Sequence, residues 1–395
     1  MRVPLLDLSK QYRALEAEIR AAIERVLATQ RFILGPEGTS FEKAAADYCG
    51  APHAVGVSSG TDALLAVLMA LGIGPGDAVI TSAYSFFATG GCIARVGARP
   101  IFVDIDATTF NLSSAALESY IDNRCRESRG KLLNGKGETI RAIIPVHLFG
   151  LCCEMDPIHR ISEQYQLDVI EDAAQAIGAE YLTAHMGRRR AGTMGEAGCF
   201  SFYPSKNLGA AGDAGMIVCR DEELAKRLRI LRQHGMEPRY YHHVIGGNFR
   251  LDEMQAAILN VKLPHLEKWS AARRAAADRY RNEFEQRGLT RQITLPAEPY
   301  RDRNLTNHHI YHQYVIRTPK RDELREHLAK REVATAIYYP LGLHEQKCFA
   351  YLGYKKGELP ETGRAARETL ALPIYPEISR EAQRYVVDSI ANFFE

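Results

Sequence analysis

Residues 198–215 read GCFSFYPSKNLGAAGDAG, a stretch in which one lysine, Lys206, stands in a loop between two short apolar runs. The apolar runs predict strands, and the serine, proline, asparagine and small residues between them predict a tight turn. A lysine that loses part of its hydration in such a place has a lowered pKa and becomes a nucleophile toward carbonyl groups. The commoner alternative is a hydrated lysine on a surface loop. The other segments of the chain are needed to choose between the two.

Length and composition describe an ordinary globular protein. The 395 residues suffice for two domains, and 46% of them are hydrophobic and 25% charged. The formal charge of +2, from 50 basic and 48 acidic residues, does not indicate a nucleic acid partner. Residues 1–20 form a charged amphipathic pattern rather than a signal peptide, and no apolar run is long enough to cross a membrane. Eight scattered cysteines without a C-x-x-C pair predict a reduced, cytoplasmic protein with no metal site.

Upstream of Lys206, apolar runs of strand length alternate with helical patterns. Strands are predicted at 54–57, 78–81, 100–105, 142–148 and 167–170, and helices at 8–30, from 40 onward, and at 62–71, 87–96, 113–121 and 156–165. This alternation predicts a largely parallel α/β sheet, in which ligands bind beyond the carboxyl ends of the strands. The polar segment 123–139 interrupts the alternation and predicts a surface loop or flap.

Downstream of Lys206 the pattern changes near residue 265. A strand at 214–219, a helix at 221–234 and a long helical pattern at 251–287, interrupted at Pro264, come first. They are followed by a predicted strand at 309–317, a helix at 321–331, a short strand at 335–339 and a final helix. The sequence therefore predicts two domains, an N-terminal segment with a large α/β domain (1–265) and a smaller α+β domain (266–395).

Two loops upstream of Lys206 offer groups for a phosphate and for a ring. The residues SSGT at 58–61 lie between a strand and a helix, where backbone N–H groups, hydroxyls and a glycine suit an anion, although Ser59 could simply cap the helix. This loop is neither G-x-G-x-x-G nor a Walker loop. Asp172 ends an apolar run, so it is expected at a strand tip, within reach of a heteroaromatic nitrogen. The alternative is a cap for a helix that starts at Ala173.

Two further residues complete one set. Phe86 follows a strand and could stack on a planar ligand, although a core aromatic is commoner. Asn248 lies in a glycine-rich loop, where it could be only a turn residue. An anion cradle, an aromatic platform, an acid for a ring nitrogen and a lysine that can form a Schiff base are together what pyridoxal phosphate requires.

With these residues the chain resembles the DegT/DnrJ/StrS sugar aminotransferases, which are fold type I enzymes dependent on pyridoxal phosphate. The resemblance runs from FILGP at 32–36 to LPI at 372–374, and its motifs are SSGTDAL (58–64), EDAAQAIGA (171–179), FSFYPSKNLGAAGDAG (200–215) and GGNFRLDEMQAAIL (246–259). It implies an α/β fold with a large, mostly parallel-sheet domain and a smaller α+β C-terminal domain. It also implies a homodimer with shared active sites.

The resemblance implies a role for each matching residue. Lys206 is expected to form the Schiff base and then to carry a proton, and Asp172 to pair with the pyridine nitrogen. The other residues expected at the cofactor are Gln175 near its phenolic oxygen, Phe86 on its ring, Gly60, Thr61 and Ser201 at its phosphate, and Asn248 at the phosphate of the neighbouring subunit. Residues expected toward the substrate are Tyr241, His242, Arg250, Tyr338 and His344.

The reaction that the resemblance implies moves an amino group in two halves. L-glutamate converts pyridoxal phosphate to pyridoxamine phosphate, which aminates a nucleotide-linked keto-sugar and gives an amino sugar for a polysaccharide or a glycosylated natural product. Lys206 argues against the dehydrating relatives, which carry histidine at this position. Residues 240–246 favour a 3-keto over a 4-keto sugar, whereas Gly342 departs from the frequent Tyr-Tyr-Pro-x-Pro-Leu-His pattern near the sugar.

Two other functions remain open from the sequence. One is a regulatory or structural protein that keeps the fold without turnover. The other is a different fold type I activity on amino acids, such as that of a lyase.

Overall fold

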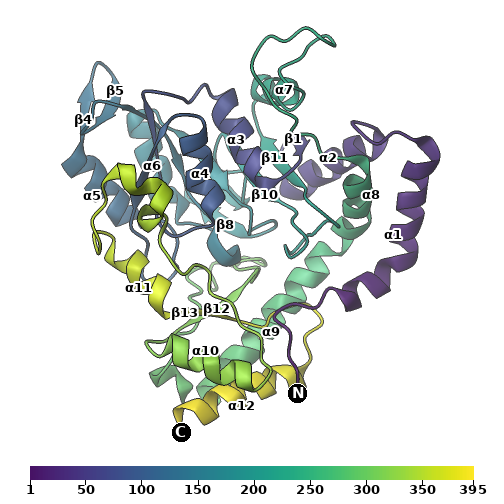
Figure 1. Ribbon diagram of the computed structural model, residues 1–395, viewed down its shortest axis with the longest axis vertical. Coiled ribbons are helices and arrows are strands. Elements are labelled where there is room, and N and C mark those ends of the chain that lie inside the picture. The colour runs from purple at the N-terminus through teal and green to yellow at the C-terminus, as the bar shows by residue number, and fades with distance from the viewer.

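The computed structural model describes residues 1–395 and is built around one large sheet (Figure 1). The central strands follow the order β1-β11-β10-β7-β6-β2-β3. Only β11 runs antiparallel to its neighbours, and the other neighbouring pairs are parallel. These strands are β1 (His53–Val57), β2 (Asp77–Ser82), β3 (Arg99–Val103), β6 (Thr139–Ile144), β7 (Asp168–Asp172), β10 (Ala197–Ser201) and β11 (Gly215–Cys219). The predicted α/β class with a mostly parallel sheet is confirmed.

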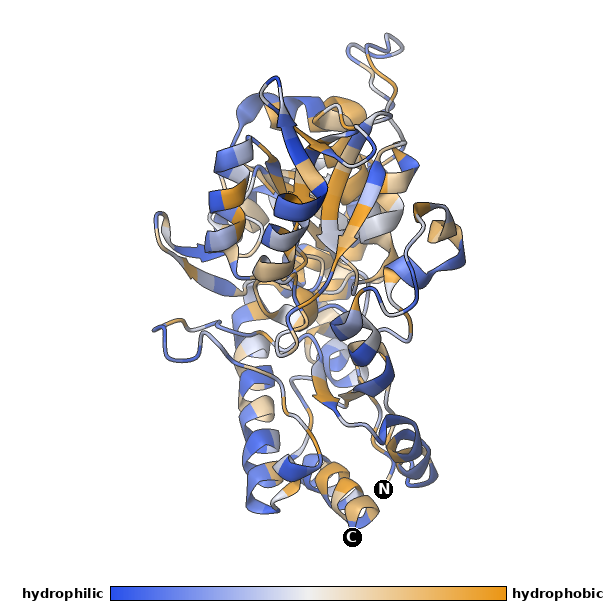
Figure 2. Ribbon diagram, turned by 90° about the vertical axis from the view of Figure 1, so that its left-hand side faces the viewer, coloured by the Kyte–Doolittle hydropathy of each residue, from blue (hydrophilic) through white to orange (hydrophobic).

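Helices cover both faces of this sheet, as parallel strands require. One face packs against α3 (Gly60–Ala70), α4 (Phe87–Arg95) and α7 (Glu222–Leu231). The other packs against α2 (Pro36–Cys49), α5 (Ser114–Arg124), α6 (Met155–Tyr165) and α8 (Glu253–Lys262). Successive strand residues alternate between the two cores, so that Val79 belongs to the first and Ile80 to the second. Figure 2 accordingly shows apolar strands in the middle of the molecule.

The segment 123–139 is not the surface loop that its polarity predicted. It contains a hairpin of β4 (Cys125–Ser128) and β5 (Lys131–Asn134), and β5 joins the sheet through Leu133 opposite Thr139 of β6. Leu132 is only 3% exposed, and its burial explains why the segment folds back on the protein. A second hairpin that the sequence analysis missed is formed by β8 (Glu180–Thr183) and β9 (Gly187–Arg190).

The C-terminal part has its own two-stranded sheet and its own core. In it, β12 (Tyr314–Arg317) pairs with β13 (Thr369–Leu372), and α9 (Leu266–Gln286), α10 (Arg321–Lys330) and α12 (Arg380–Phe394) pack against them. The predicted strand at 335–339 is wrong, because Ala336 makes only an isolated bridge to Ala371. The domain boundary at 265 stays a prediction. Val3, at the other end of the chain, pairs with Val333 and is buried in this C-terminal core, while α1 (Ser9–Thr29) packs along α8 (Figure 1).

The edge strand β3 is covered by one side chain from the segment that leads to α11 (Pro360–Glu368). The hydroxyl of Tyr354 accepts a hydrogen bond from the Phe102 N–H (2.8 Å) and donates one to the Phe102 carbonyl (2.9 Å). Pro100, the other β3 residue that faces away from β2, has no N–H to satisfy.

Candidate active site

The loops at the carboxyl ends of β1, β2, β7 and β10 meet at one edge of the sheet. Asp172 is the last residue of β7 and lies opposite Cys199 of β10, the strand that leads into the lysine loop. Asp172 is 5% exposed and accepts hydrogen bonds from the Thr89 hydroxyl (2.7 Å) and the Ala174 N–H (3.2 Å). No helix begins at Ala173, so the capping alternative for Asp172 is wrong.

Lys206 is partly buried beside this carboxylate. Burial lowers the pKa of its ammonium to about 8, and the negative charge of Asp172 acts in the opposite direction. Burial raises the pKa of Asp172 above its usual value, against the hydrogen bonds from Thr89 and Ala174 and the charge of Lys206. The alternative of a freely hydrated loop lysine therefore does not describe Lys206, whose amine is neutral in a large fraction of molecules near pH 8.

Small residues let the lysine loop fold tightly on itself. The Lys206 N–H donates to the Tyr203 carbonyl (2.8 Å), and the Ala210 N–H donates to the Phe202 carbonyl (2.8 Å). A Cβ atom on Gly209 would lie only 2.3 Å from the carbonyl oxygen of Pro204, so this position accepts no side chain. The loop therefore holds the lysine backbone in a defined place.

An anion cradle forms where the SSGT loop meets the end of β10. The Ser59 hydroxyl accepts from the Asp62 N–H (3.0 Å) and caps α3, which was the alternative to an anion site, but the first N–H groups of the helix remain for a ligand. A Cβ atom on Gly60 would lie 2.7 Å from the Ser201 Cβ, so the helix start and the Ser201 side chain are in contact. The positive end of α3, with Thr61 in its first turn, and the Ser201 hydroxyl can together hold a phosphate.

The aromatic and the amide that were expected at the cofactor, Phe86 and Gln175, both lie against Tyr339. Phe86 is 57% exposed, so the core alternative is wrong, and its ring centroid lies 6.2 Å from that of Tyr339. Gln175 accepts from the Phe149 N–H (2.8 Å) and donates to the Tyr339 hydroxyl (3.0 Å). Tyr339 was missed by the sequence analysis, which named its neighbour Tyr338. Only the Tyr-Tyr-Pro motif pointed to this segment, and it does not say which tyrosine faces Gln175.

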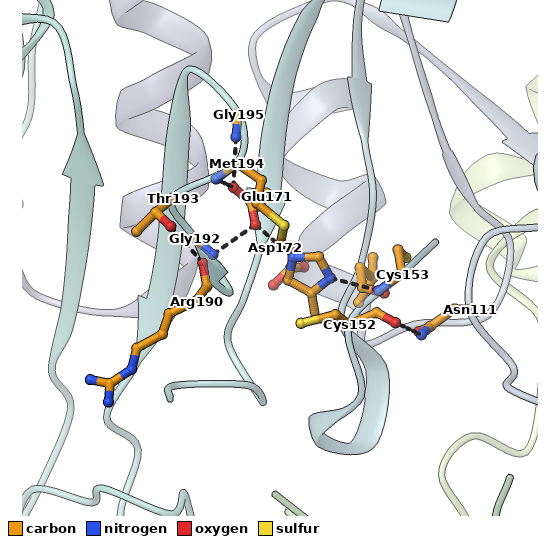
Figure 3. Close-up of polar contacts among 12 residues, drawn as sticks. Asn111, Cys152, Cys153, Glu171, Asp172, Arg190, Gly192, Thr193, Met194 and Gly195 are labelled. Atoms are coloured by element: carbon orange, nitrogen blue, oxygen red, sulfur yellow. Dashed lines mark hydrogen bonds and ion pairs between the residues drawn. The ribbon is translucent and has the colours of Figure 1, made fainter. Parts of the chain in front are cut away.

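A buried pair beneath Asp172 was also missed (Figure 3). Glu171 and His147 are both fully buried, with 2.8 Å between His147 Nε2 and Glu171 Oε2. The other Glu171 contacts are the N–H groups of Gly192 (2.7 Å), Met194 (2.6 Å) and Gly195 (2.7 Å). Because the Cys153 N–H donates to His147 Nδ1 (3.0 Å), Nε2 carries the proton and donates to Glu171. The backbone N–H of His147 also donates to the Asp172 carbonyl (3.0 Å), so this pair supports the strand end that carries Asp172.

The remaining predicted residues lie in three places. Arg250 pairs with Val57 at the end of β1, and the exposed Asn248 precedes Phe249, whose carbonyl accepts from the Ser58 N–H (3.0 Å). Tyr241 and His242 are exposed in the loop that projects beyond α7 (Figure 1). Neither residue forms a hydrogen bond with Lys206 or Asp172. Tyr338 and His344 belong to the segment after residue 335, and their role toward a substrate stays a prediction.

Gly342 has a packing reason that the motif alone did not give. His344 is 4% exposed, and a Cβ atom on Gly342 would lie 2.7 Å from its Cε1 and 2.7 Å from the Thr362 Cγ2. A proline at this position would collide with both side chains. The absence of a side chain at Gly342 therefore leaves the space in which the His344 ring is buried.

These residues fit pyridoxal phosphate. The Gly60 and Ser201 contact leaves a cradle for a phosphate, Asp172 is a buried carboxylate for a protonated ring nitrogen, and Lys206 is an amine with a lowered pKa. No group of three or more His, Cys, Asp or Glu side chains is arranged to hold a metal ion, and none of the helices is both long and apolar enough to cross a membrane. The fold and this set of groups define a fold type I aminotransferase.

Comparisons with known proteins agree with this class. The DegT/DnrJ/EryC1/StrS aminotransferase family matches residues 13–391. A protein of Geobacillus stearothermophilus named pleiotropic regulatory protein is 48% identical over 394 residues, which are 100% of this chain and 99% of the relative. The UDP-N-acetyl-3-dehydro-alpha-D-glucosamine 3-aminotransferase of Acidithiobacillus ferrooxidans is 41% identical over 379 residues, 96% of this chain and 94% of the relative. The crystal structure of DesV of S. venezuelae in complex with a ketimine intermediate has a TM-score of 0.89 at 40% identity and covers 100% of this chain and 99% of its own.

The chain belongs to the DegT/DnrJ/EryC1/StrS aminotransferase family. The predicted family, fold type and enzyme class are thereby confirmed.

Proposed function

We propose that the chain is a pyridoxal phosphate-dependent aminotransferase that moves an amino group from L-glutamate to the keto group of a nucleotide-linked sugar. The observation that carries the proposal is Lys206, whose burial lowers its pKa to about 8 beside the buried carboxylate of Asp172. The Acidithiobacillus relative is named a 3-aminotransferase of a 3-dehydro sugar, and this supports a 3-keto over a 4-keto position. The product is an amino sugar for a polysaccharide or a glycosylated natural product.

Each residue of the site has a task in this reaction. Bound pyridoxal phosphate supplies a ring that withdraws electrons from the carbon bearing the amino group. Asp172 would keep the ring nitrogen protonated, and the α3 N-terminus with Gly60, Thr61 and Ser201 would hold the phosphate. Lys206, with its lowered pKa, is the amine that would hold the cofactor's aldehyde carbon, and the same side chain could hold and release a proton beside the substrate carbon.

Positioning groups complete the site. The Gln175 amide is oriented by the Phe149 N–H and the Tyr339 hydroxyl. In the proposed complex, Phe86 would stack on the cofactor ring and Gln175 would lie near its phenolic oxygen. In the proposed homodimer, Asn248 from the exposed segment after α7 reaches the phosphate of the neighbouring subunit. The absence of paired cysteines among the eight free thiols supports a cytoplasmic enzyme.

A regulatory protein without turnover is the second candidate, because a relative at 48% identity is named a regulatory protein. A fold that had lost its chemistry would have no need of a partly buried lysine beside a buried carboxylate, since each costs desolvation energy. The third candidate is another fold type I activity on amino acids, such as that of a lyase. It uses the same cofactor, so only the reaction products distinguish it from the proposed aminotransferase.

The test is an absorbance and transfer assay on the purified protein. We expect a yellow protein whose visible band shifts when glutamate is added and is absent in Lys206→Ala. A panel of nucleotide-linked 3-keto and 4-keto sugars with glutamate should then give 2-oxoglutarate and an amino sugar. A colourless protein that does not take up pyridoxal phosphate would refute the proposed enzymatic function. Cleavage of an amino acid without amine transfer would favour the third candidate.

A further inference from the structure

Two buried hydroxyl groups connect the loop after β2 to the carboxylate of Asp172. Thr89 lies in the first turn of α4 and is fully buried, and Ser85, four residues earlier, is 4% exposed. The oxygen Oγ1 of Thr89 lies 2.8 Å from Ser85 Oγ and 2.7 Å from Asp172 Oδ2. The three side chains therefore form one hydrogen-bonded row that ends at the carboxylate.

The number of hydrogens on these groups decides the direction of the row. A hydroxyl carries one hydrogen, whereas an ionised carboxylate carries none and can only accept. When Asp172 is ionised, the Thr89 hydrogen is directed to Asp172, so the contact between the two hydroxyls needs the Ser85 hydrogen. Ser85 then donates to Thr89, and Thr89 donates to Asp172. Every hydrogen in the row has an acceptor in this arrangement.

Protonation of Asp172 disrupts the arrangement. A proton on Oδ2 would be directed to Thr89 Oγ1, and the Thr89 hydrogen would turn to Ser85. The Ser85 hydrogen would then have no acceptor, because the structure gives this hydroxyl no other protein partner. A proton on Oδ1 would weaken that oxygen as the acceptor of the Ala174 N–H (3.2 Å). Since an unpaired buried donor is unfavourable, the row favours the ionised carboxylate.

The row acts against the burial of Asp172. Burial raises the pKa of this carboxyl, whereas the hydrogen bonds from Thr89 and the backbone and the charge of Lys206 lower it. The other ionisable groups that interact with Asp172 from the surrounding elements are His147, Cys92, Cys153, Cys199 and Tyr339. His147 is a neutral ring, and burial raises the pKa of each thiol and of the phenol. Apart from Lys206, hydrogen bonds therefore support the charge of Asp172.

We propose that Thr89 and Ser85 are positioning residues for Asp172, which orient its carboxylate and hold it in the ionised form that a protonated ring nitrogen requires. The inference rests on the proposed function only in taking Asp172 as the partner of that nitrogen. Phe86, the residue expected to stack on the ring, lies in the same turn between Ser85 and Thr89. The row therefore joins the carboxylate to the turn that carries the stacking residue.

Four substitutions separate this role from a merely structural one. Thr89→Val removes the hydroxyl and keeps the shape of the side chain, whereas Thr89→Ser keeps the hydroxyl. Ser85→Ala removes the far end of the row. The matched control is Thr81→Val, because Thr81 is also fully buried and its hydroxyl donates to the Ile144 carbonyl (2.7 Å) and not to Asp172.

The measurement is the titration of the Asp172 carboxyl in the cofactor-free protein, followed by carbon-13 NMR and assigned with Asp172→Asn. We expect Thr89→Val to raise the midpoint by about one to two pH units, the effect of losing a hydrogen bond to a charged group, and Ser85→Ala to raise it by less. Thr89→Ser and Thr81→Val should keep the wild-type midpoint. An unchanged midpoint in Thr89→Val or in Ser85→Ala, or a shift of equal size in Thr89→Ser or in Thr81→Val, would overturn the inference.

The direction of the row is tested in the unsubstituted protein and does not depend on how well a variant folds. Neutron diffraction from the cofactor-free protein at neutral pH should place the Ser85 deuterium toward Thr89 and the Thr89 deuterium toward Asp172 Oδ2. A deuterium on Asp172, or a Thr89 deuterium directed to Ser85, would overturn the inference.

Neither experiment contains pyridoxal phosphate, glutamate or a sugar, so the inference and the proposed function can fail separately. A protein that shows the expected midpoints but binds no pyridoxal phosphate would support the inference and refute the proposed function. Unchanged midpoints in a protein that aminates a keto-sugar would refute the inference alone.

Discussion

The contact between Gly60 and Ser201 predicts how the phosphate cradle responds to one methyl group. In Gly60→Ala the new Cβ would lie 2.7 Å from the Ser201 Cβ and 3.3 Å from its Cα, so the start of α3 or the end of β10 must move. Overpacking of this kind costs about 1–3 kcal/mol of folding free energy. The same displacement moves the N–H groups that would face a phosphate, and losing one charge-assisted hydrogen bond weakens binding about 10- to 100-fold.

The assay compares two ligands and two alanine variants. Dissociation constants of pyridoxal phosphate and of pyridoxal, which has no phosphate, would be measured for Gly60→Ala and for the control Gly74→Ala. At Gly74 a Cβ would meet only the Val96 carbonyl oxygen, at an ordinary 3.6 Å. We expect Gly60→Ala to weaken pyridoxal phosphate binding selectively. An equal loss for both ligands, or an equal loss in the control, would refute the assignment of the cradle.

Three further predictions follow from the buried ionisable groups. Replacing Asp172 with asparagine removes the charge that raises the pKa of Lys206, so the midpoint of pyridoxal phosphate uptake should fall below pH 8, and a midpoint that stays constant would contradict the pairing. Burial lowers the pKa of His309 to about 3, so below pH 6.5 the unfolded chain binds a proton at this residue that the folded chain does not. His309 should therefore lower stability by about 1.4 kcal/mol for each pH unit of acidification, and in urea unfolding His309→Gln should reduce the slope by this amount. Glu171→Gln puts an amide where three backbone N–H groups donate and should cost about 3 kcal/mol in the same measurement, against a near-neutral change for the exposed Glu118→Gln.

The groups that sequence reasoning located share one property. Asp172 ends an apolar strand and the SSGT loop follows one, and parallel strands bring their carboxyl ends to one edge of a sheet, whereas Ser201 was named only from the family resemblance. Local pattern was therefore enough to bring the lysine loop, the carboxylate and the SSGT loop to one edge of the sheet. The glycine-rich setting of Lys206 is likewise explained by a local contact, that of Gly209 with Pro204.

The residues that sequence reasoning missed depend on long-range packing. Tyr339 reaches Gln175 across 164 positions of the chain. The pairing of β12 with β13 joins segments separated by two helices, and the hairpin at 125–134 is held by one buried leucine in a polar stretch. No periodicity within a short window reports such contacts, because both partners look like ordinary loop residues.

The hydroxyl of Tyr354 has a consequence for self-association. An uncovered edge strand offers its outward N–H and carbonyl groups to strands of other molecules, which is a common route to aggregation. On β3, Pro100 supplies no donor and both backbone groups of Phe102 are bound by Tyr354, so this one phenol occupies the outward groups at the middle of the edge strand. Tyr354 comes late in the chain. A nascent or C-terminally truncated protein would therefore expose the outward backbone groups of β3 to strands of other molecules until the segment with Tyr354 packs against them.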